Sequence, residues 1–291
     1  MSKPLVAAAV QMTSGPELAR NLEKAALLIA RAADRGAELV VLPENFAIMT
    51  GAEADKRAAA ETIDFPNPTT ETSGTPETHG RASPGRIISA MAEVAARHQL
   101  HLVLGGMPER SAVSGERVHN SCVLLGPEGT VKAVYRKIHL FDVFIPDGAI
   151  YAESKTVAAG NRPVVAETPW GGLGLSVCYD LRFPELYRKL AEAGARMIVV
   201  PAAFTLHTGR DHWHVLLRAR AIENLAYVIA PAQFGRHDEK RVTFGHSLIA
   251  DPWGTVLADC ADGEGIALAE LDFDRQDRLR RELPSLSHRR L

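Results

Sequence analysis

Short apolar runs alternate along the chain with stretches in which apolar positions recur every three or four residues. The first pattern is typical of buried strands and the second of helices with one buried face. The predicted strands are 4–11, 38–42, 101–107, 119–126, 130–136, 163–168, 172–178, 196–203, 226–233, 243–250, 254–259 and 265–272. The predicted helices follow Ser14 and span 84–98, 184–193 and 211–224, with a short charged helix and tail from Asp274.

The first helix carries the clearest local signals. Ser14 is placed to cap it, Pro16 falls in the first turn, Glu17 stands three residues after the cap, and Gly36 ends it. A second set of signals lies near residues 62–83, where Thr, Pro, Ser and Gly dominate and neither helix nor strand is favoured. This segment is predicted to be an inserted loop.

The order of elements mixes βαβ units with antiparallel strands late in the chain. This order predicts an α/β (α+β) fold with two mixed sheets flanked by helices. We expect a single domain over residues 1–291, with 274–291 as a C-terminal tail.

Composition and charge narrow the classes of function. The chain has 291 residues, 46% of them hydrophobic, and a formal net charge of −2. This balance argues against a nucleic-acid platform or a protein that binds anionic membranes. No apolar run reaches the roughly 20 residues of a membrane span, and the apolar start stops at Gln11, so we interpret it as a buried strand.

Cysteine usage indicates a reducing compartment. The three cysteines, Cys122, Cys178 and Cys260, form no Cys-x-x-Cys pair and are odd in number. A disulfide framework is therefore not expected, and we predict a cytoplasmic location. Free cysteines are commonly small core residues, which is our interpretation of Cys122 and Cys260.

Cys178 differs from the other two cysteines in its surroundings. It stands at the predicted end of an apolar strand, six residues before Pro184, where a helix is predicted to start. A thiol at such a strand end faces a crevice, where a nucleophile belongs in an α/β protein. Thiol attack on an amide also needs a base and a positive charge for the oxyanion. Glu44 and Lys137, each at or just beyond a strand end, supply that pair.

Three motifs carry a resemblance to a known family: Leu-Pro-Glu44-Asn-Phe, Tyr-Arg-Lys137-Ile-His-Leu-Phe-Asp and Val-Cys178-Tyr-Asp-Leu-Arg-Phe-Pro-Glu. In this order they resemble the carbon–nitrogen hydrolase (nitrilase) superfamily, from about residue 5 to the C-terminus. The resemblance implies a four-layer αββα sandwich, a homodimer or larger homo-oligomer, and catalytic roles for Glu44, Lys137 and Cys178. It also implies that Glu153 is a supporting catalytic carboxylate.

Within the superfamily, Tyr-Asp-Leu-Arg after the cysteine resembles the amidase branch with omega-amidase and deaminated glutathione amidase. We therefore expect an amide hydrolase acting on a small carboxylate substrate with a terminal carboxamide. Deaminated glutathione is the first candidate. The alternatives are 2-oxoglutaramate, N-carbamoyl amino acids, nitriles, and a non-catalytic module on the same fold. We expect no metal or organic cofactor.

The expected mechanism begins with Glu44 deprotonating Cys178, which attacks the amide carbon. Lys137 and the backbone N–H of Tyr179 hold the oxyanion in this scheme. Ammonia leaves, and water activated by Glu44 releases the acid from the thioester.

Three further side chains are candidates for substrate binding, namely Arg182, Thr208 and Phe204. Arg182 could clamp a substrate carboxylate, or it could form a salt bridge with Glu185 or Asp180. Thr208, four residues after Phe204, could donate to the same carboxylate or cap the 211–224 helix. A zinc site at His207, His212 and His214 is not favoured, because they lack the spacing of known zinc motifs.

Overall fold

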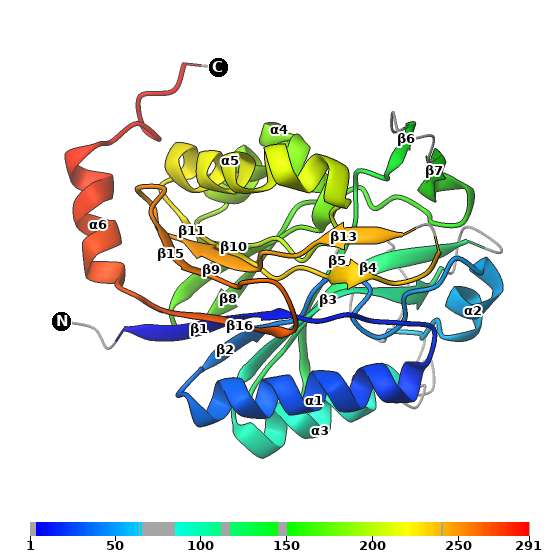
Figure 1. The fold of residues 1–291 in the computed structure, drawn as a ribbon. Helices are drawn as coiled ribbons and strands as arrows, with labels where there is room; N and C mark the ends of the chain where they lie inside the picture. Colours follow the sequence, from blue (N-terminus) through cyan, green and yellow to red (C-terminus); the bar gives the residue numbers. More distant parts are fainter. Residues whose placement is uncertain are drawn as a thin grey trace, which may run out of the picture.

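The structure is a computed structural model that describes residues 4–63, 65, 85–111, 117–144, 150–239 and 241–290 (Figure 1). Two six-stranded sheets form its centre. The first has the order β16 (Gly265–Leu271), β1 (Leu5–Gln11), β2 (Leu39–Val41), β3 (His101–Arg110), β4 (Val118–Leu125) and β5 (Val131–Arg136). The second has the order β15 (Val256–Asp259), β14 (Leu248–Ala250), β11 (Tyr227–Ala230), β10 (Ala195–Val199), β9 (Gly171–Leu175) and β8 (Val164–Thr168).

Both sheets are mixed. Strands β1, β2 and β3 run parallel, as do β9, β10 and β11, whereas the outer neighbours pair antiparallel. Side chains alternate along β1, so that Leu5, Ala7 and Ala9 enter the core between the sheets. Ala8 and Val10 enter a second core beneath the helices. Burial on both faces explains why this strand is almost continuously apolar.

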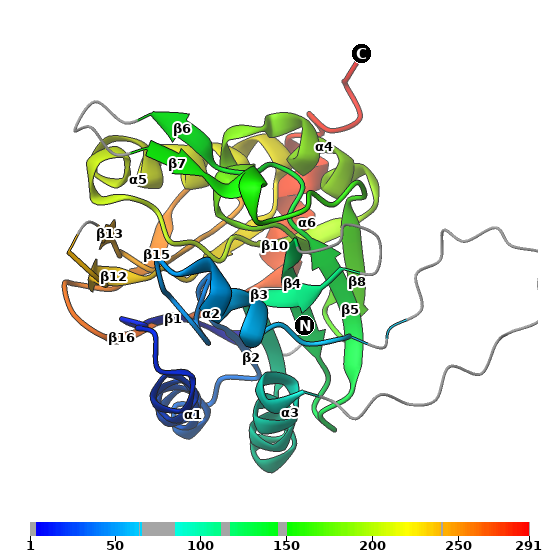
Figure 2. The same cartoon turned by 90° about the vertical axis from the view of Figure 1, so that its right-hand side faces the viewer.

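Four helices form the outer layers. Helices α1 (Leu18–Asp34) and α3 (Arg86–His98) cover the first sheet, and α4 (Pro184–Glu192) and α5 (Leu206–Asn224) cover the second. Figures 1 and 2 show the resulting order of helices, sheet, sheet and helices. The predicted αββα sandwich is confirmed. Helix α6 (Phe273–Glu282) packs at one end, and its Gln276 donates to the backbone carbonyls of Arg196 and Leu225.

Several short elements were not predicted. They are helix α2 (Glu53–Ala58), the pair β6 (Asp142–Phe144) and β7 (Ile150–Ala152), the strand β12 (Phe234–Arg236) that pairs with β13 (Val242–Phe244), and the 3-10 turns η1 (Glu153–Lys155) and η2 (Cys178–Arg182). The predicted strand 243–250 is two strands, because Gly245 and His246 adopt positive φ between β13 and β14. Of the predicted loop at 62–83, residue 64 and residues 66–83 lie outside the described residues.

Several predicted boundaries were wrong. Strands β10 and β11 end at Val199 and Ala230, before their predicted ends at 203 and 233. Ser14 does not cap α1, which begins at Leu18; its hydroxyl instead donates to the Phe46 carbonyl oxygen. The strand expected to reach Cys178 ends at Leu175. Helix α5 begins five residues before the predicted start at 211, with Thr205 at its N-cap. In the described part of the chain, no helix is both long and apolar enough to cross a membrane.

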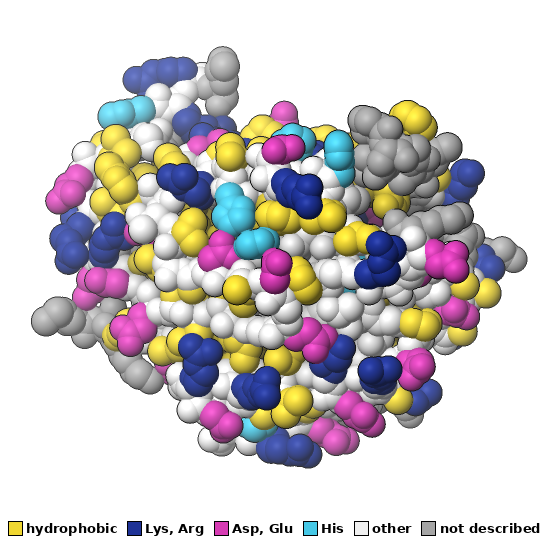
Figure 3. All heavy atoms as spheres, viewed as in Figure 1, with side chains coloured by type: hydrophobic (Ala, Val, Ile, Leu, Met, Phe, Trp, Pro, Cys, Tyr) yellow, Lys and Arg dark blue, Asp and Glu magenta, His cyan; other side chains and the backbone are white. Residues whose placement is uncertain are grey.

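Charged side chains of both signs are interspersed over the face shown in Figure 3. They include both basic and acidic groups along the lower edge, where α1 lies in the same view. This distribution matches the near-neutral charge of the sequence.

Candidate active site

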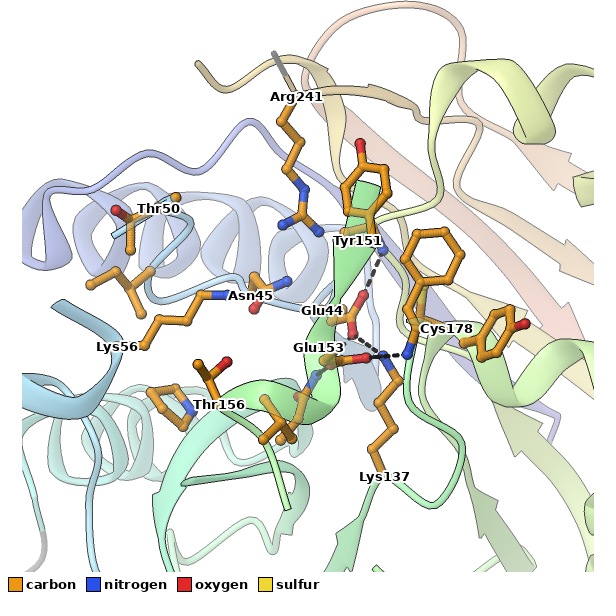
Figure 4. A pocket seen from close by; sticks show the side chains of 18 of the residues that line it. Glu44, Asn45, Thr50, Lys56, Lys137, Tyr151, Glu153, Thr156, Cys178 and Arg241 are labelled. Carbon is orange, nitrogen blue, oxygen red and sulfur yellow. Dashed lines mark hydrogen bonds and ion pairs between the residues drawn. The ribbon is translucent and has the colours of Figure 1, made fainter. Parts of the chain in front are cut away.

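A cavity of about 1140 Å³ opens where the two sheets present the loops that follow β2, β5, β9 and β10. Its size is at or above the upper end of the usual range for small-molecule sites, about 300–1,000 Å³. Figure 4 shows Glu44, Lys137, Glu153 and Cys178 directed toward one another on one side of it. All the side chains selected from the sequence line this cavity: Glu44, Lys137, Glu153, Cys178, Tyr179, Arg182, Phe204 and Thr208.

Glu44 lies in the loop after β2 and is 3% exposed. One carboxylate oxygen accepts from Lys137 Nζ at 3.0 Å and Asn120 Nδ2 at 2.9 Å; the other accepts from the Ala203 N–H at 3.0 Å. Burial by itself raises the pKa of this carboxyl, but the Lys137 charge and hydrogen bonds outweigh burial and hold the pKa below 4.5. Glu44 is therefore ionised at neutral pH and able to accept a proton.

Lys137 lies just after β5 and is 2% exposed. Its ammonium donates to Glu44 and to both carboxylate oxygens of Glu153, at 3.1 and 2.9 Å. Burial lowers the pKa of Lys137, yet the Glu153 and Glu44 carboxylates more than compensate and hold it above 10.5. Glu153 opens η1 and also accepts from the Phe141 N–H at 2.7 Å, which fixes its direction. The lysine is thus a charged group held between two carboxylates.

Cys178 opens η2 with φ of 50°, a conformation that non-glycine residues adopt only when the surroundings hold it. Its N–H donates to the Pro201 carbonyl oxygen at 2.8 Å, and its thiol lies close enough to the Glu44 carboxylate for the two groups to shift each other's pKa. Burial, and then the Glu44 charge, raise the pKa of this thiol well above 9.0. The resting state is consequently a neutral thiol beside an ionised carboxylate, so attack requires proton transfer to Glu44.

Asp180 holds the Cys178 turn in place, a role that the sequence did not reveal. It is fully buried and accepts from Tyr135 Oη at 2.7 Å, the Val177 N–H at 2.8 Å and the His139 N–H at 3.1 Å. His139 Nδ1 also lies 2.7 Å from this carboxylate. The contacts tie η2 to the segment that carries Lys137, so the nucleophile and the ammonium are positioned relative to each other.

Asn120, on β4, was also missed. Its amide nitrogen donates to Glu44 and, at 3.3 Å, to Glu153, while its side-chain oxygen has no hydrogen-bond partner in the described part of the chain. Gly106, with φ of 51°, packs so closely that a Cβ there would lie 2.8 Å from the Glu44 Cγ and 2.6 Å from the Asn120 oxygen. Glycine is therefore required beside these two side chains.

Tyr179 follows Cys178, and no hydrogen bond to its backbone N–H occurs among the described residues. This donor is free to meet an oxyanion. Arg182, at the end of η2, lies with its guanidinium 5.1 Å from the Phe204 ring centre, and Nη1 is 3.2 Å from His212 Nδ1. Neither salt bridge considered for Arg182, to Glu185 or to Asp180, occurs among the described residues.

Phe204 and Thr208 lie on the same wall of the cavity. Thr208 is in the first turn of α5, and its hydroxyl is 2.9 Å from that of Thr205. Because Thr205 occupies the N-cap, the interpretation of Thr208 as the cap was wrong. Its hydroxyl remains available to the cavity, so its predicted contact with substrate stays a prediction.

The other cysteines and the histidines lie elsewhere. Cys122 is fully buried on β4, and burial raises the pKa of its thiol; burial raises that of Cys260 to about 11. His207, His212 and His214 do not converge on one point. His214 instead meets His246 across Asp259, whose two oxygens lie 2.6 and 3.1 Å from the two imidazoles.

Comparison with known proteins places this geometry in a family. Residues 6–281 match the family model described as carbon-nitrogen hydrolase. The chain is 48% identical over 289 residues, 99% of this chain and 98% of the relative, to a deaminated glutathione amidase of Synechocystis sp.. It is 43% identical to the human deaminated glutathione amidase, covering 99% of this chain and 82% of that protein. The crystal structure of Saccharomyces cerevisiae Nit3, a member of branch 10 of the nitrilase superfamily, aligns with a TM-score of 0.82 at 31% identity, covering 98% of this chain and 96% of the other.

Proposed function

The chain belongs to the carbon–nitrogen hydrolase family and is an amide C–N hydrolase, and we propose that it hydrolyses deaminated glutathione through a thioester on Cys178. One observation supports the assignment most strongly. The Glu44 carboxylate accepts from the ammonium of Lys137 and lies close enough to the thiol of Cys178 for the two groups to shift each other's pKa, in a cavity open to substrate. This arrangement brings a proton acceptor, a nucleophile and a positive charge together.

In the first step, Cys178 Sγ attacks the amide carbon while its proton passes to Glu44. The carbonyl π electrons move to oxygen, and the oxyanion is stabilised by Lys137 Nζ and the Tyr179 N–H. Both donors are in place before reaction, because Glu153 holds the lysine and the contacts of Asp180 hold the turn that carries Tyr179. Little reorganisation is then needed as charge develops.

In the second step, the oxyanion collapses and the C–N bond breaks as Glu44 returns the proton to the leaving nitrogen. A thioester remains on Cys178. Water then enters, gives one proton to Glu44 and attacks the thioester carbon, and collapse releases the acid and a thiolate that regains the proton. Glu44 is thereby regenerated as a carboxylate after each half-reaction.

The substrate decides which group leaves. Glutathione is a tripeptide whose glutamate is linked through its side-chain carboxyl, so cleavage of that amide in deaminated glutathione releases cysteinylglycine. The leaving group is then an amine instead of the ammonia expected from the sequence. With 2-oxoglutaramate, which shares the acyl half, ammonia does leave. We propose that Arg182, Phe204 and Thr208 contact the acyl half, because they lie along the wall next to Cys178.

The assembly proposed for this enzyme is a homodimer or a larger homo-oligomer. Val215 and Ile222 lie seven residues apart on α5 and are 66% and 45% exposed, which leaves apolar surface on the outer helix layer. A second copy packed there would bury them. We also propose that the chain is a single domain and works in the cytoplasm, as its three free cysteines suggest.

Product analysis tests the proposed function. Purified enzyme is given deaminated glutathione, 2-oxoglutaramate, an N-carbamoyl amino acid and a nitrile, and the acid, amine, ammonia and carbon dioxide formed are measured. We expect the highest kcat/KM for deaminated glutathione, with cysteinylglycine as product. The Cys178→Ala variant is the matched negative control. Faster turnover of a carbamoyl compound or a nitrile would replace the proposal by that chemistry.

A further inference from the structure

Two basic side chains stand on the wall of the cavity away from Cys178. Lys56 extends from α2 and Arg241 from the turn before β13, and both are half-buried. Figure 4 shows them entering the cavity from different elements, with Glu44, Glu153, Lys137 and Cys178 beyond their tips. Neither was selected from the sequence as a site residue. The fold alone brings them together, since α2 and β13 are far apart along the chain.

Among the described residues, these two cations lack the kind of partner that Lys137 and Arg182 have. Lys137 is held by Glu44 and Glu153, and Arg182 by His212 and the Phe204 ring. By contrast, no hydrogen bond or ion pair joins the Lys56 ammonium or the Arg241 guanidinium to any residue in the described portions of the chain. A half-buried cation without an anion is costly, and two that face one cavity cost more than one.

The pKa of Lys56 reflects its burial and the second cation beside it. Burial, and next the positive charge of Arg241, lower the pKa of Lys56 below 10.5, while Glu153 and Glu44 partly offset them. An anion placed between Lys56 and Arg241 would offset the cost of burial and the repulsion between the two cations. The pKa of Lys137, in the same cavity, is raised instead, because the Glu153 and Glu44 carboxylates adjoin its ammonium.

We propose that Lys56 and Arg241 form a subsite that binds a carboxylate carried by the leaving amine of the substrate. The inference rests on the proposed amide hydrolysis and names the substrate class more closely, as amides whose amine half is itself an acid. Cysteinylglycine ends in such a carboxylate. A guanidinium and an ammonium directed at one point are well suited to it.

The position of the subsite favours the amine half over the acyl half. Asp238 and Glu239, which line the cavity next to Arg241, are exposed, so this wall borders the entrance. The amine departs first and must reach solvent, whereas the acyl group stays on Cys178. A cavity of about 1140 Å³ also leaves room for a dipeptide beside a five-carbon acyl group.

The test compares two substrates that share one acyl half. Deaminated glutathione carries a carboxylate on its leaving amine, and 2-oxoglutaramate releases ammonia. The variants Lys56→Met and Arg241→Met are measured beside Arg20→Met, which removes an exposed cation on α1 outside the cavity. We expect each cavity variant to lower kcat/KM for deaminated glutathione about 10- to 100-fold, mainly through KM. The loss on 2-oxoglutaramate should be at least about tenfold smaller.

A second measurement does not depend on turnover. Cysteinylglycine should inhibit wild-type hydrolysis of 2-oxoglutaramate competitively, and inhibition should weaken about tenfold in Lys56→Met. The Lys56→Arg variant should be inhibited by cysteinylglycine almost as strongly as the wild type.

Three other results would each overturn a different claim. Equal losses on both substrates would overturn the assignment to the amine half, and losses no larger than those of Arg20→Met would remove the subsite. Wild-type enzyme that cleaves neither substrate would refute the proposed function itself, independently of Lys56 and Arg241.

Discussion

Lys137 and Lys56 line the same cavity but differ in burial, in charged neighbours and in pKa, and these differences distinguish its two halves. Lys137 is almost fully buried between two carboxylates, and its pKa is raised; Lys56 is half-buried beside Arg241, and its pKa is lowered. A cation whose charge is already balanced can stabilise an oxyanion without binding a permanent anion. An unbalanced cation instead favours an anionic ligand. The comparison supports the proposed division of the cavity, with the chemistry in one half and substrate selection in the other.

The largest expected effect comes from replacing Lys137, whose charge is balanced by Glu44 and Glu153. Lys137→Met should lower kcat by about 10³-fold or more on deaminated glutathione and 2-oxoglutaramate alike, because the main oxyanion donor is lost. KM should change little. Lys56→Met is the matched comparison, since it also removes a lysine charge from the cavity. Steady-state kinetics measure kcat and KM of both variants, with circular dichroism to verify folding. A Lys137→Met enzyme with more than a tenth of wild-type kcat would contradict the different roles given to Lys137 and Lys56.

Asn120→Asp should cost about 100-fold in kcat. The substitution places a third carboxylate beside Lys137 and removes the donor that now bridges Glu44 and Glu153. Like charges raise one another's pKa, so Glu44 would also become easier to protonate. Asn120→Ala removes the donor without adding charge and should lose less. Equal kcat values for the two variants would show that charge balance around Lys137 is unimportant.

The pH dependence should follow Glu44. Its pKa lies below 4.5 and only its ionised form accepts the thiol proton, so wild-type kcat/KM should stay level down to about pH 5 and fall tenfold per pH unit below the pKa. The stabilisation from the Glu44–Lys137 pair is likewise present above the unfolded-state pKa and lost as pH falls through the folded one. In Lys137→Met, the strongest influence that opposes burial is lost, so the pKa of Glu44 should rise and the acid limb should move upward. An acid limb above pH 5.5 in the wild type would contradict this assignment.

The smallest effect should be that of salt. Raising potassium chloride from about 0.05 to 0.5 M screens half-exposed charges, so KM for deaminated glutathione should rise about three- to fivefold. The rise should largely disappear in Arg241→Met, and 2-oxoglutaramate should respond less. An identical salt response of wild type and variant would mean that Arg241 does not contact substrate.

Sequence patterns predicted the sheets and outer helices because each strand and each helix stripe had to be buried. Leu5, Ala7 and Ala9 illustrate this, since their alternation with Ala8 and Val10 is a local property of one strand. The cap at Ser14 could not be predicted in the same way. Its hydroxyl satisfies the carbonyl of Phe46, a partner that only the folded chain supplies.

The catalytic candidates were found because three motifs surround them, whereas the residues that hold them were missed. Asp180 lies inside one of those motifs, but its role depends on Tyr135 and His139. Asn120 depends on contacts with both Glu44 and Glu153. Lys56 and Arg241 matter because they meet at one cavity with no ionic partner among the residues that the structure describes, and neither property leaves a pattern along a chain.

Mass analysis of the acid-quenched enzyme tests the central claim most directly. Wild-type protein mixed with deaminated glutathione and quenched during turnover should carry one 2-oxoglutaryl group, located by peptide mapping on Cys178 and absent from Cys122, Cys260 and the Cys178→Ala variant. Turnover without any such adduct, together with undiminished hydrolysis by Cys178→Ala, would contradict the account.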